Sequence, residues 1–238
     1  MPIRGEDLVK VYNKQRVVDK VNFELNEGEI VGILGPNGAG KTTTFYMVVG
    51  LIRPESGRVL LNGRDITKLP MHRRAKLGIG YLAQEASVFR NLTVEDNIKA
   101  ILEMIDRPKE DEEILESLLD EFDLNYVRDR KGYMLSGGER RRVEIARALV
   151  TDPEYILLDE PFSGVDPIAV SDIQDIVKHL QTKDLGVLVT DHSVRETLEI
   201  TDRAYIMHEG EILLSGTSDE IADSEIAREF YLGEKFQM

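Results

Sequence analysis

The sequence predicts an α/β fold: a core with a mixed sheet, an antiparallel β subdomain at the N-terminus and an inserted α-helical subdomain. Short apolar runs at 30–34, 155–158 and 187–190 have the length and composition of buried strands. Helical patterns lie between these runs, and this alternation is typical of a largely parallel sheet. Residues 85–150 carry mostly helical patterns. They therefore indicate a block of helices inserted into the core.

The first part of the core follows from local patterns. Residues 3–11 and 16–25 alternate or run apolar around a polar turn, which predicts a β-hairpin. A glycine-rich loop comes after the first buried run, and residues 41–51 have a helical pattern. Residues 59–61 and 79–82 are short and apolar, so we expect two further strands there.

The inserted block should hold three helices. Thr93 and Asp96 have the spacing of a capping box, which suits a helix over 94–104. Pro108 is a suitable first residue for a second helix, and a third helix should follow Ser136.

The rest of the core resumes after this block. Asp166 and Pro167 form a good helix start, with an N-cap aspartate and proline at the first helical position. Residues 204–207 and 212–215 flank a Glu-Gly turn and predict a second hairpin, and two short polar helices should finish the chain. We expect one domain over residues 1–238, with its core at 1–84 and 151–238 and its helical subdomain at about 85–150.

Composition excludes several classes of function. The 238 residues include 30 Lys and Arg against 44 Asp and Glu, a net charge of −14. That balance argues against a protein that coats nucleic acid, because such affinity comes largely from basic side chains. There is no cysteine, which excludes disulfides and thiol catalysis. The polar N-terminus does not resemble a secretory signal, and no apolar run approaches ~18 residues, so we expect a cytosolic chain without direct membrane insertion.

One glycine-rich loop carries the strongest functional signal. It follows a short apolar strand and opens a helix, in the full pattern G-x-x-x-x-G-K-[ST]. Its backbone N–H groups and the helix N-terminus suit phosphate oxygens, and a chance glycine turn before lysine is the weaker alternative. The loop predicts a nucleoside triphosphate site with Mg²⁺. Its residues are Gly35, Pro36, Asn37, Gly38, Ala39, Gly40, Lys41, Thr42 and Thr43.

A second acidic motif supports this site. The apolar strand at 155–158 ends in Asp159 and Glu160. Asp159 suits a metal partner, and Glu160 could orient or deprotonate an attacking water. A strand that merely meets solvent at an acidic pair is the alternative, and the loop upstream favours the functional interpretation.

A third motif carries a family resemblance. Leu135-Ser136-Gly137-Gly138-Glu139 resembles the signature sequence of the ABC family of P-loop ATPases. Ser136 and Glu139 also form an ordinary capping box. Both interpretations hold together, because a capped helix start with free glycine amides is itself a phosphate site.

Further residues match the family in the family's order. Gln84 resembles the Q-loop glutamine, with Ala83 where many relatives have proline, and His192 resembles the switch histidine. The alternatives are a plain loop residue for Gln84 and, for His192, an incidental position before a Ser193–Glu196 capping box. Tyr12 resembles the aromatic that stacks on adenine, with Val17 beside it, although it could be an ordinary strand aromatic. The D-loop match is Ser163, Gly164, Val165 and Asp166.

The resemblance implies a mechanism. Two copies would pack head to tail as an ATP-dependent homodimer, and Ser136–Glu139 of one copy would face the ATP held by Lys41 of the other. Glu160 would act as general base, and His192 would contact the γ-phosphate. Thr42, Gln84 and Asp159 would attend Mg²⁺. Three consecutive basic residues, Arg140–Arg142, look like a basic patch. Arg140 can pair with Glu144, and Glu144 with Arg147, so the spacing favours a solvated helix face over such a patch.

Six stretches carry a closer match within the family: 42–50, 84–90, 138–144, 159–167, 190–197 and 231–234. In them the chain resembles the ATPase subunits of lipopolysaccharide-export transporters. That resemblance implies membrane partners LptF and LptG with LptC, and a peripheral place on the cytoplasmic face of the inner membrane. Phe89 and Arg90 would line the groove that receives these partners, while simple core packing is the alternative for Phe89. An ATPase of a branched-chain amino-acid importer and a soluble ATP switch remain the other hypotheses.

Overall fold

A six-stranded mixed sheet forms the centre of the molecule. The computed structural model describes residues 2–105, 111–163 and 165–227. Five strands of the sheet run parallel, and the edge strand β10 is antiparallel to β9, as the sequence predicts. The spatial order is β10 (Glu211–Thr217), β9 (Arg203–His208), β3 (Ile30–Leu34), β8 (Gly186–Asp191), β7 (Tyr155–Asp159) and β6 (Ile79–Leu82).

A second sheet is antiparallel and confirms the predicted N-terminal β part. Its turn between β1 and β2 places Asn13 and Lys14 at φ values of 49° and 68°, the left-handed region typical of tight hairpins. This sheet packs its apolar face onto helix α1 and the central sheet. Its order is β2 (Gln15–Leu25), β1 (Ile3–Tyr12), β4 (Ser56–Leu61) and β5 (Arg64–Asp65).

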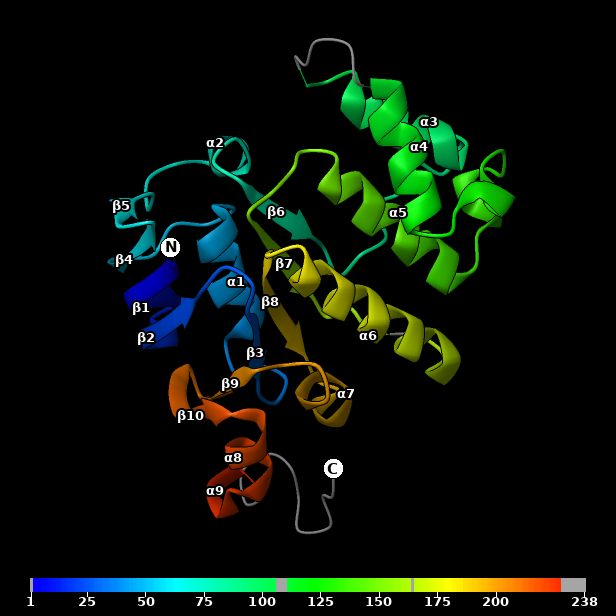
Figure 1. The fold of residues 1–238 in the computed structure, drawn as a ribbon. Coiled ribbons are helices and arrows are strands. Elements are labelled where there is room, and N and C mark those ends of the chain that lie inside the picture. Colours follow the sequence, from blue (N-terminus) through cyan, green and yellow to red (C-terminus); the bar gives the residue numbers. More distant parts are fainter. Residues whose placement is uncertain (1, 106–110, 164, 228–238) are drawn as a thin grey trace.

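Helix α1 (Lys41–Val49) lies between the two sheets and follows the glycine-rich loop (Figure 1). It ends where Gly50, at φ 85°, donates its N–H to the Tyr46 carbonyl. The buried Arg74 guanidinium donates to the Met47 and Val48 carbonyls at 2.7 and 2.6 Å. These bonds satisfy carbonyls that a helix end leaves without partners, so Arg74 caps the end of α1.

The remaining core helices cover the sheet and close the chain. The predicted helix start at Asp166 is confirmed, because its carboxylate accepts the Ala169 N–H at 3.1 Å. The capping box expected at Ser193 is wrong, since its side chain makes no cap hydrogen bond. These helices are α2 (Met71–Ala75), α6 (Pro167–Thr182), α7 (Val194–Leu198), α8 (Ser218–Asp223) and α9 (Glu225–Ala227).

The inserted block is helical, as expected. Thr93 and Ser136 both form complete capping boxes at their helix starts. The start proposed at Pro108 lies outside the described residues. The division of the chain at 84 and 150 stays a prediction. The block contains α3 (Val94–Leu102), α4 (Asp111–Glu121), α5 (Gly137–Leu149) and the short 3₁₀ turns at Asn125–Val127 and Gly132–Met134.

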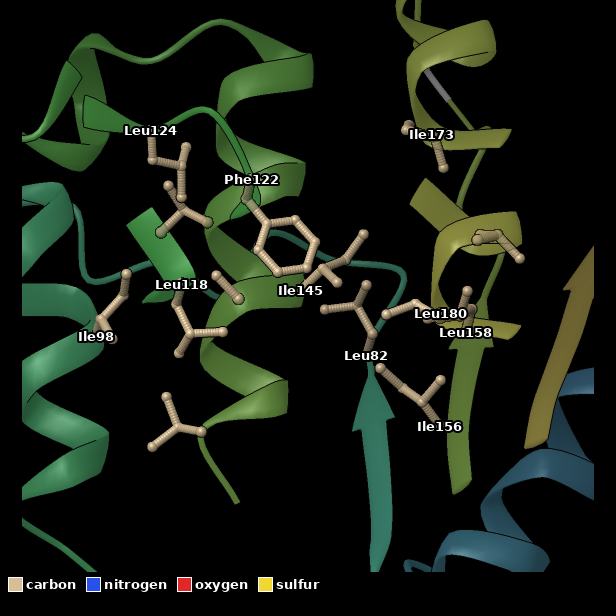
Figure 2. Close-up of a cluster of buried hydrophobic side chains, with 14 of the residues drawn as sticks. Leu82, Ile98, Leu118, Phe122, Leu124, Ile145, Ile156, Leu158, Ile173 and Leu180 are labelled. Carbon is tan, nitrogen blue, oxygen red and sulfur yellow. The ribbon is translucent and has the colours of Figure 1, made fainter. Parts of the chain in front are cut away.

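One apolar cluster joins this block to the sheet. Figure 2 shows Phe122 and Leu118 of the block close to Ile145 of α5, with Leu82, Ile156 and Leu158 of the sheet beyond them. All these side chains are buried. The helical block therefore rests on a core that it shares with β6, β7 and α6, rather than on one of its own.

Candidate functional site

The predicted motifs meet at one edge of the central sheet. Strands β3, β8, β7 and β6 are neighbours and parallel, so their carboxyl ends lie together. The glycine-rich loop follows β3, His192 follows β8, Glu160 follows β7 and Gln84 comes soon after β6. Ligands of open α/β sheets bind at this edge.

The loop is shaped by backbone contacts with distant parts of the chain. A Cβ atom on Gly35 would collide with the Met207 carbonyl, and one on Gly40 would collide with the Val17 carbonyl. Both glycines have positive φ values, 154° and 101°. Ala39 also ties the loop to a distant segment, because its carbonyl accepts the Gly210 N–H at 3.1 Å. The loop conformation is therefore set by strand β9, the turn after it, and strand β2.

Lys41 is held inside this loop. Its ammonium group donates to the Gly35 and Pro36 carbonyls at 2.7 and 3.1 Å, and the residue is 5% exposed. Burial lowers the pKa of Lys41, while the nearby carboxylates of Glu160, Asp191 and Asp159 oppose that shift. A cation held this way is ready for phosphate oxygens. Around it Pro36, Thr42 and Thr43 are half-buried, and Asn37 and Gly38 are exposed.

Asp159 is fully buried at the end of β7. Its carboxylate accepts the Thr190 hydroxyl at 2.8 Å and the Tyr81 hydroxyl at 3.4 Å. Burial raises the pKa of Asp159, and these hydrogen bonds and the positive charge of Lys41 oppose the shift. The two hydroxyls fix the orientation of the carboxylate.

Glu160 sits where the chain leaves the sheet in the left-handed region, at φ 46°. Its N–H donates to the Thr190 carbonyl at 2.8 Å, and its carboxylate accepts the Gln84 amide at 2.7 Å. His192 Nδ1 lies 3.7 Å from the same carboxylate. The structure thus brings Gln84, Glu160 and His192 together, and residues from three separate loops contact one another. A left-handed glutamate is uncommon enough to indicate a site that constrains it.

The D-loop residues lie beside this group. Ser163 donates its N–H to the Glu160 carbonyl at 3.2 Å, and Asp166 caps α6. Gly164 lies outside the described residues. Gln84, Gly137, Glu160 and Ser163 all line one small cavity of about 40 Å³. The signature helix α5 therefore begins next to the D-loop of its own chain.

The signature residues form the predicted capping box. Ser136 accepts the Glu139 N–H at 3.2 Å, and Glu139 accepts the Ser136 N–H at 2.7 Å. Ser136 and Gly137 are exposed, whereas Gly138 is buried. A Cβ atom on Gly137 would meet nothing within 4 Å. The packing of this chain does not require a glycine there.

The Tyr12 ring does not lie with Lys41, Glu160 and His192. It lies at the hairpin turn, 45% exposed, and the Lys10 ammonium stands 5.3 Å from its centroid. Val17 is nearer to the site, because its carbonyl packs against Gly40 of the loop.

Phe89 and Arg90 form an exposed turn on the helical side of the molecule. Phe89 is 43% exposed, which disfavours the core-packing alternative, and its ring lies 4.5 Å from the Arg147 guanidinium. The fully buried Asn97 amide accepts the Phe89 N–H at 2.8 Å and donates to the Phe89 and Thr93 carbonyls at 3.1 and 2.8 Å. The turn is therefore held in one conformation.

The solvated pairing of Arg140 with Glu144 is wrong. Glu144 is buried and pairs with Arg141 at 3.2 Å instead. Its other oxygen accepts the Ser87 N–H at 2.6 Å, and Arg147 donates to the Ser87 carbonyl at 2.6 Å. Helical spacing named the wrong arginine and placed this face in water, whereas the face packs against the segment that links Gln84 to Phe89.

Sequence reasoning missed three residues around the site. Thr190, which is buried, and Tyr81, which is half-buried, orient Asp159. Asp191, also fully buried, accepts the Phe162 N–H at 3.0 Å and the Ser193 N–H at 2.8 Å. Two charged residues in the apolar strand ends, Asp159 and Asp191, were the available signal, because a buried carboxylate needs partners.

The donor set fits Mg²⁺. Asp159 supplies a carboxylate, Thr42 a hydroxyl and Gln84 an amide oxygen, which are the ligand types that this ion prefers. Among the described residues there is no group of three or more His, Cys, Asp or Glu side chains that could hold a metal alone. In the described part of the chain, every helix is too short or too polar to cross a membrane.

Comparisons with known proteins give the family. The profile of the ABC transporter family matches residues 18–163. The chain is 54% identical to the lipopolysaccharide export ATP-binding protein LptB of Acidithiobacillus ferridurans, over 99% of this chain and 98% of that protein. It is 53% identical to LptB of Haemophilus influenzae and 52% to LptB of Escherichia coli K12, each over 99% of both chains.

Solved structures agree with the sequence relatives. The ADP conformation of an ATP-binding cassette of an ABC transporter matches with a TM-score of 0.87 and 30% identity, covering 98% of this chain and all of that one. A nucleotide-free cassette matches with a TM-score of 0.86, at the same identity and coverage. The predicted fold and family are confirmed. The chain belongs to the ABC transporter family, as an ATP-binding subunit that hydrolyses ATP.

Proposed function

We propose that this chain is the ATP-hydrolysing subunit of a transporter that extracts lipopolysaccharide from the inner membrane. The observation that carries the hydrolytic part is the convergence of Lys41, Glu160 and His192 at one sheet edge, with Gln84 bonded to Glu160. The identity of the cargo rests on relatives named LptB, which match at 52–54% identity over nearly the whole chain. Those relatives favour this cargo over a branched-chain amino acid.

The residues divide the reaction among them. Loop amides from Gly35 to Thr43 and the Lys41 ammonium bind the phosphates, and Tyr12 with Val17 receives the adenine. Glu160 takes the proton from the attacking water, Gln84 orients the Glu160 carboxylate, and His192 contacts the γ-phosphate. Thr42, Asp159 and Gln84 would hold a Mg²⁺ ion, which would neutralise charge on the phosphates. Positioning and charge, rather than covalent chemistry, lower the barrier.

A second copy of the chain completes each site. Ser136 and Gly137 are exposed on α5 although their amides suit phosphate oxygens, so they are available to ATP bound by another copy. We infer a head-to-tail homodimer with Ser136–Glu139 of one copy over the phosphate loop of the other. Ser163 and Asp166 of the D-loop lie at the interface.

The membrane subunits dock at the Phe89 turn. Phe89 and Arg90 present an apolar ring and a cation at the surface, and Asn97 holds the backbone of Phe89. We assign LptF and LptG, acting with LptC, as the partners that bind there. The chain then works peripherally, on the cytoplasmic face of the inner membrane, without nucleic acid.

Replacing the proposed base tests the chemistry. Glu160→Gln keeps the shape of the side chain but cannot accept a proton, so turnover should fall by about 10²–10⁴-fold. ATP binding should persist, and gel filtration with ATP should show a trapped dimer. Glu154→Gln, at the other end of β7, is the matched control and should hydrolyse ATP normally. Normal hydrolysis by Glu160→Gln would remove the base assignment.

Copurification tests the cargo. The tagged chain, expressed in its own host and isolated from detergent-solubilised membranes, should retain two integral membrane proteins identified by mass spectrometry as LptF and LptG. Recovery of permease and substrate-binding subunits for an amino acid would replace the lipopolysaccharide assignment with the importer. A chain found only in the soluble fraction would favour the soluble switch.

A further inference from the structure

A buried aspartate links the two catalytic loops directly. Asp191 is the last residue of β8 and is fully buried. Its two carboxylate oxygens accept different backbone N–H groups. Oδ2 accepts from Phe162, in the loop after β7, at 3.0 Å, and Oδ1 accepts from Ser193, in the loop after β8, at 2.8 Å. One side chain thus connects the loop that carries Glu160 with the loop that carries His192.

The same carboxylate also contacts the histidine ring. Oδ1 of Asp191 lies 3.4 Å from Nδ1 of His192, and the Glu160 carboxylate lies 3.7 Å from that same nitrogen. The histidine ring therefore has an acidic neighbour from each loop. Since Asp191 is bonded on both sides, it fixes the distance between Glu160 and His192 through backbone atoms.

Burying the charged Asp191 carboxylate costs folding free energy, which argues that the residue has a function. A carboxylate removed from water is destabilising unless hydrogen bonds and opposite charges compensate it. Here Asp191 accepts the two N–H groups, and its charge also acts on Lys41 and Arg141. A small apolar residue would end strand β8 without that cost. What only a bonded carboxylate provides at this position is the connection between the two loops.

We propose that Asp191 is a positioning residue for ATP hydrolysis, which holds the Glu160 loop and the His192 loop in the relative placement that the reaction needs. It does not bind nucleotide, and it acts through Glu160 and His192. This inference rests on the proposed roles of those two residues. Misplacement of reacting groups by about 1 Å can lower a rate by ~10²-fold, so the connection has a measurable effect.

Asp191→Asn is the first test. The amide is nearly isosteric but offers one acceptor oxygen, so either Phe162 N–H or Ser193 N–H loses its partner. In steady-state ATPase assays of the purified protein, kcat should fall about 10–100-fold while KM for ATP stays within twofold. Amide hydrogen exchange should rise at Phe162 or Ser193 and stay unchanged in β3. Normal kcat, or a raised KM with normal kcat, would overturn the inference.

Asp191→Glu separates position from charge. It keeps the negative charge and both oxygens but moves them outward by one methylene, so a positioning role predicts a lower kcat here as well. If the longer side chain supports wild-type turnover, charge alone is sufficient and the proposal is wrong. Asp202→Asn is the matched control, because Asp202 accepts the Ile30 N–H at 2.8 Å at the opposite edge of the same sheet. Its kcat should remain normal.

A double-mutant cycle with His192→Ala tests whether Asp191 acts through the histidine. If it does, the double variant should be no slower than the slower single variant, because both changes disable one unit. Fully multiplied effects would contradict that link. Glu160→Gln, measured in the same assay, tests the proposed chemistry separately from the role of Asp191. If Glu160→Gln is inactive and Asp191→Asn has normal activity, the positioning role is wrong and the proposed chemistry stands.

Discussion

The phosphate loop and the signature turn are both glycine-rich starts of helices, but the reason for glycine differs between them. Gly35 and Gly40 are required by this chain, because any side chain would collide with the carbonyls of Met207 and Val17. Gly137 faces open space, and its backbone has no positive φ. The loop is thus complete within one molecule, whereas nothing in the described chain explains why Gly137 lacks a side chain. A glycine that its own fold does not need points to close approach by something outside.

The same contrast separates other parts of the molecule. Lys41 and Asp159 are buried and bonded within the chain. Ser136 and Phe89 are exposed, although backbone hydrogen bonds hold both in place. Substitutions in the first group should damage folding or nucleotide binding. Substitutions in the second should leave the isolated molecule intact and disable its assemblies.

Gly35→Ala should have the largest effect. The new Cβ would overlap the Met207 carbonyl, and the positive φ disfavours alanine, so we expect a loss of stability of about 3 kcal/mol together with loss of ATP binding. Thermal unfolding and calorimetric titration with ATP measure both. Gly80→Ala in β6, where the added Cβ makes only ordinary contacts, is the control. Intact ATP binding in Gly35→Ala would show that the chain does not require glycine at this position, and the difference from Gly137 would be wrong.

Gly137→Asp should abolish turnover without harming the fold. A carboxylate in the first turn favours α5 itself through the helix dipole, but it would repel the phosphates of ATP held by a second copy. We expect at least a 10-fold lower kcat with unchanged Tm and unchanged ATP affinity. Gly137→Ala separates charge from size and should be milder. If Gly137→Asp hydrolyses ATP at the wild-type rate, α5 does not face a partner's nucleotide.

Phe89→Ala should affect only assembly with the membrane. Its ring packs on Arg147 at the surface, so its removal should change neither Tm nor the ATPase rate of the isolated chain. Copurification with membrane subunits should drop several-fold. Met104→Ala, an exposed residue beyond the end of α3, is the matched control. Undiminished copurification would remove the Phe89 turn from the docking surface.

Arg128→Ala should give the smallest effect, a local change in acid stability. Hydrogen bonds from Arg128 and Lys99 lower the pKa of Glu95 to about 2. A depressed carboxyl pKa stabilises the fold above the ordinary value, near 4.5, and that contribution is lost as the pH falls toward 2. Without Arg128 the Glu95 pKa should rise, as followed by carbon NMR, and acid unfolding should begin at a higher pH. An unchanged Glu95 pKa would show that Arg128 does not stabilise the charged form of Glu95 in solution.

The sequence predicted what depends on local pattern. The hairpin turn at Asn13, the capping boxes at Thr93 and Ser136 and the positions of the buried strands all follow from residues close together in the chain. The family motifs also showed which side chains to look for. The failures depend on distant partners: Glu144 faces Ser87 rather than water, and Asp191 accepts the N–H of Phe162, 29 residues earlier in the chain. No local period reports such contacts.

The strand order has a consequence for synthesis of the chain. Strand β3 and the phosphate loop after it are translated about 150 residues before β8, the strand that pairs with β3. Met207, whose carbonyl contacts the Gly35 position, is translated later still. Until those residues emerge from the ribosome, β3 lacks both of its sheet partners and its apolar faces stay uncovered. The nascent molecule must therefore remain soluble without its central strand pairing, and nucleotide can assist folding only near the end of translation.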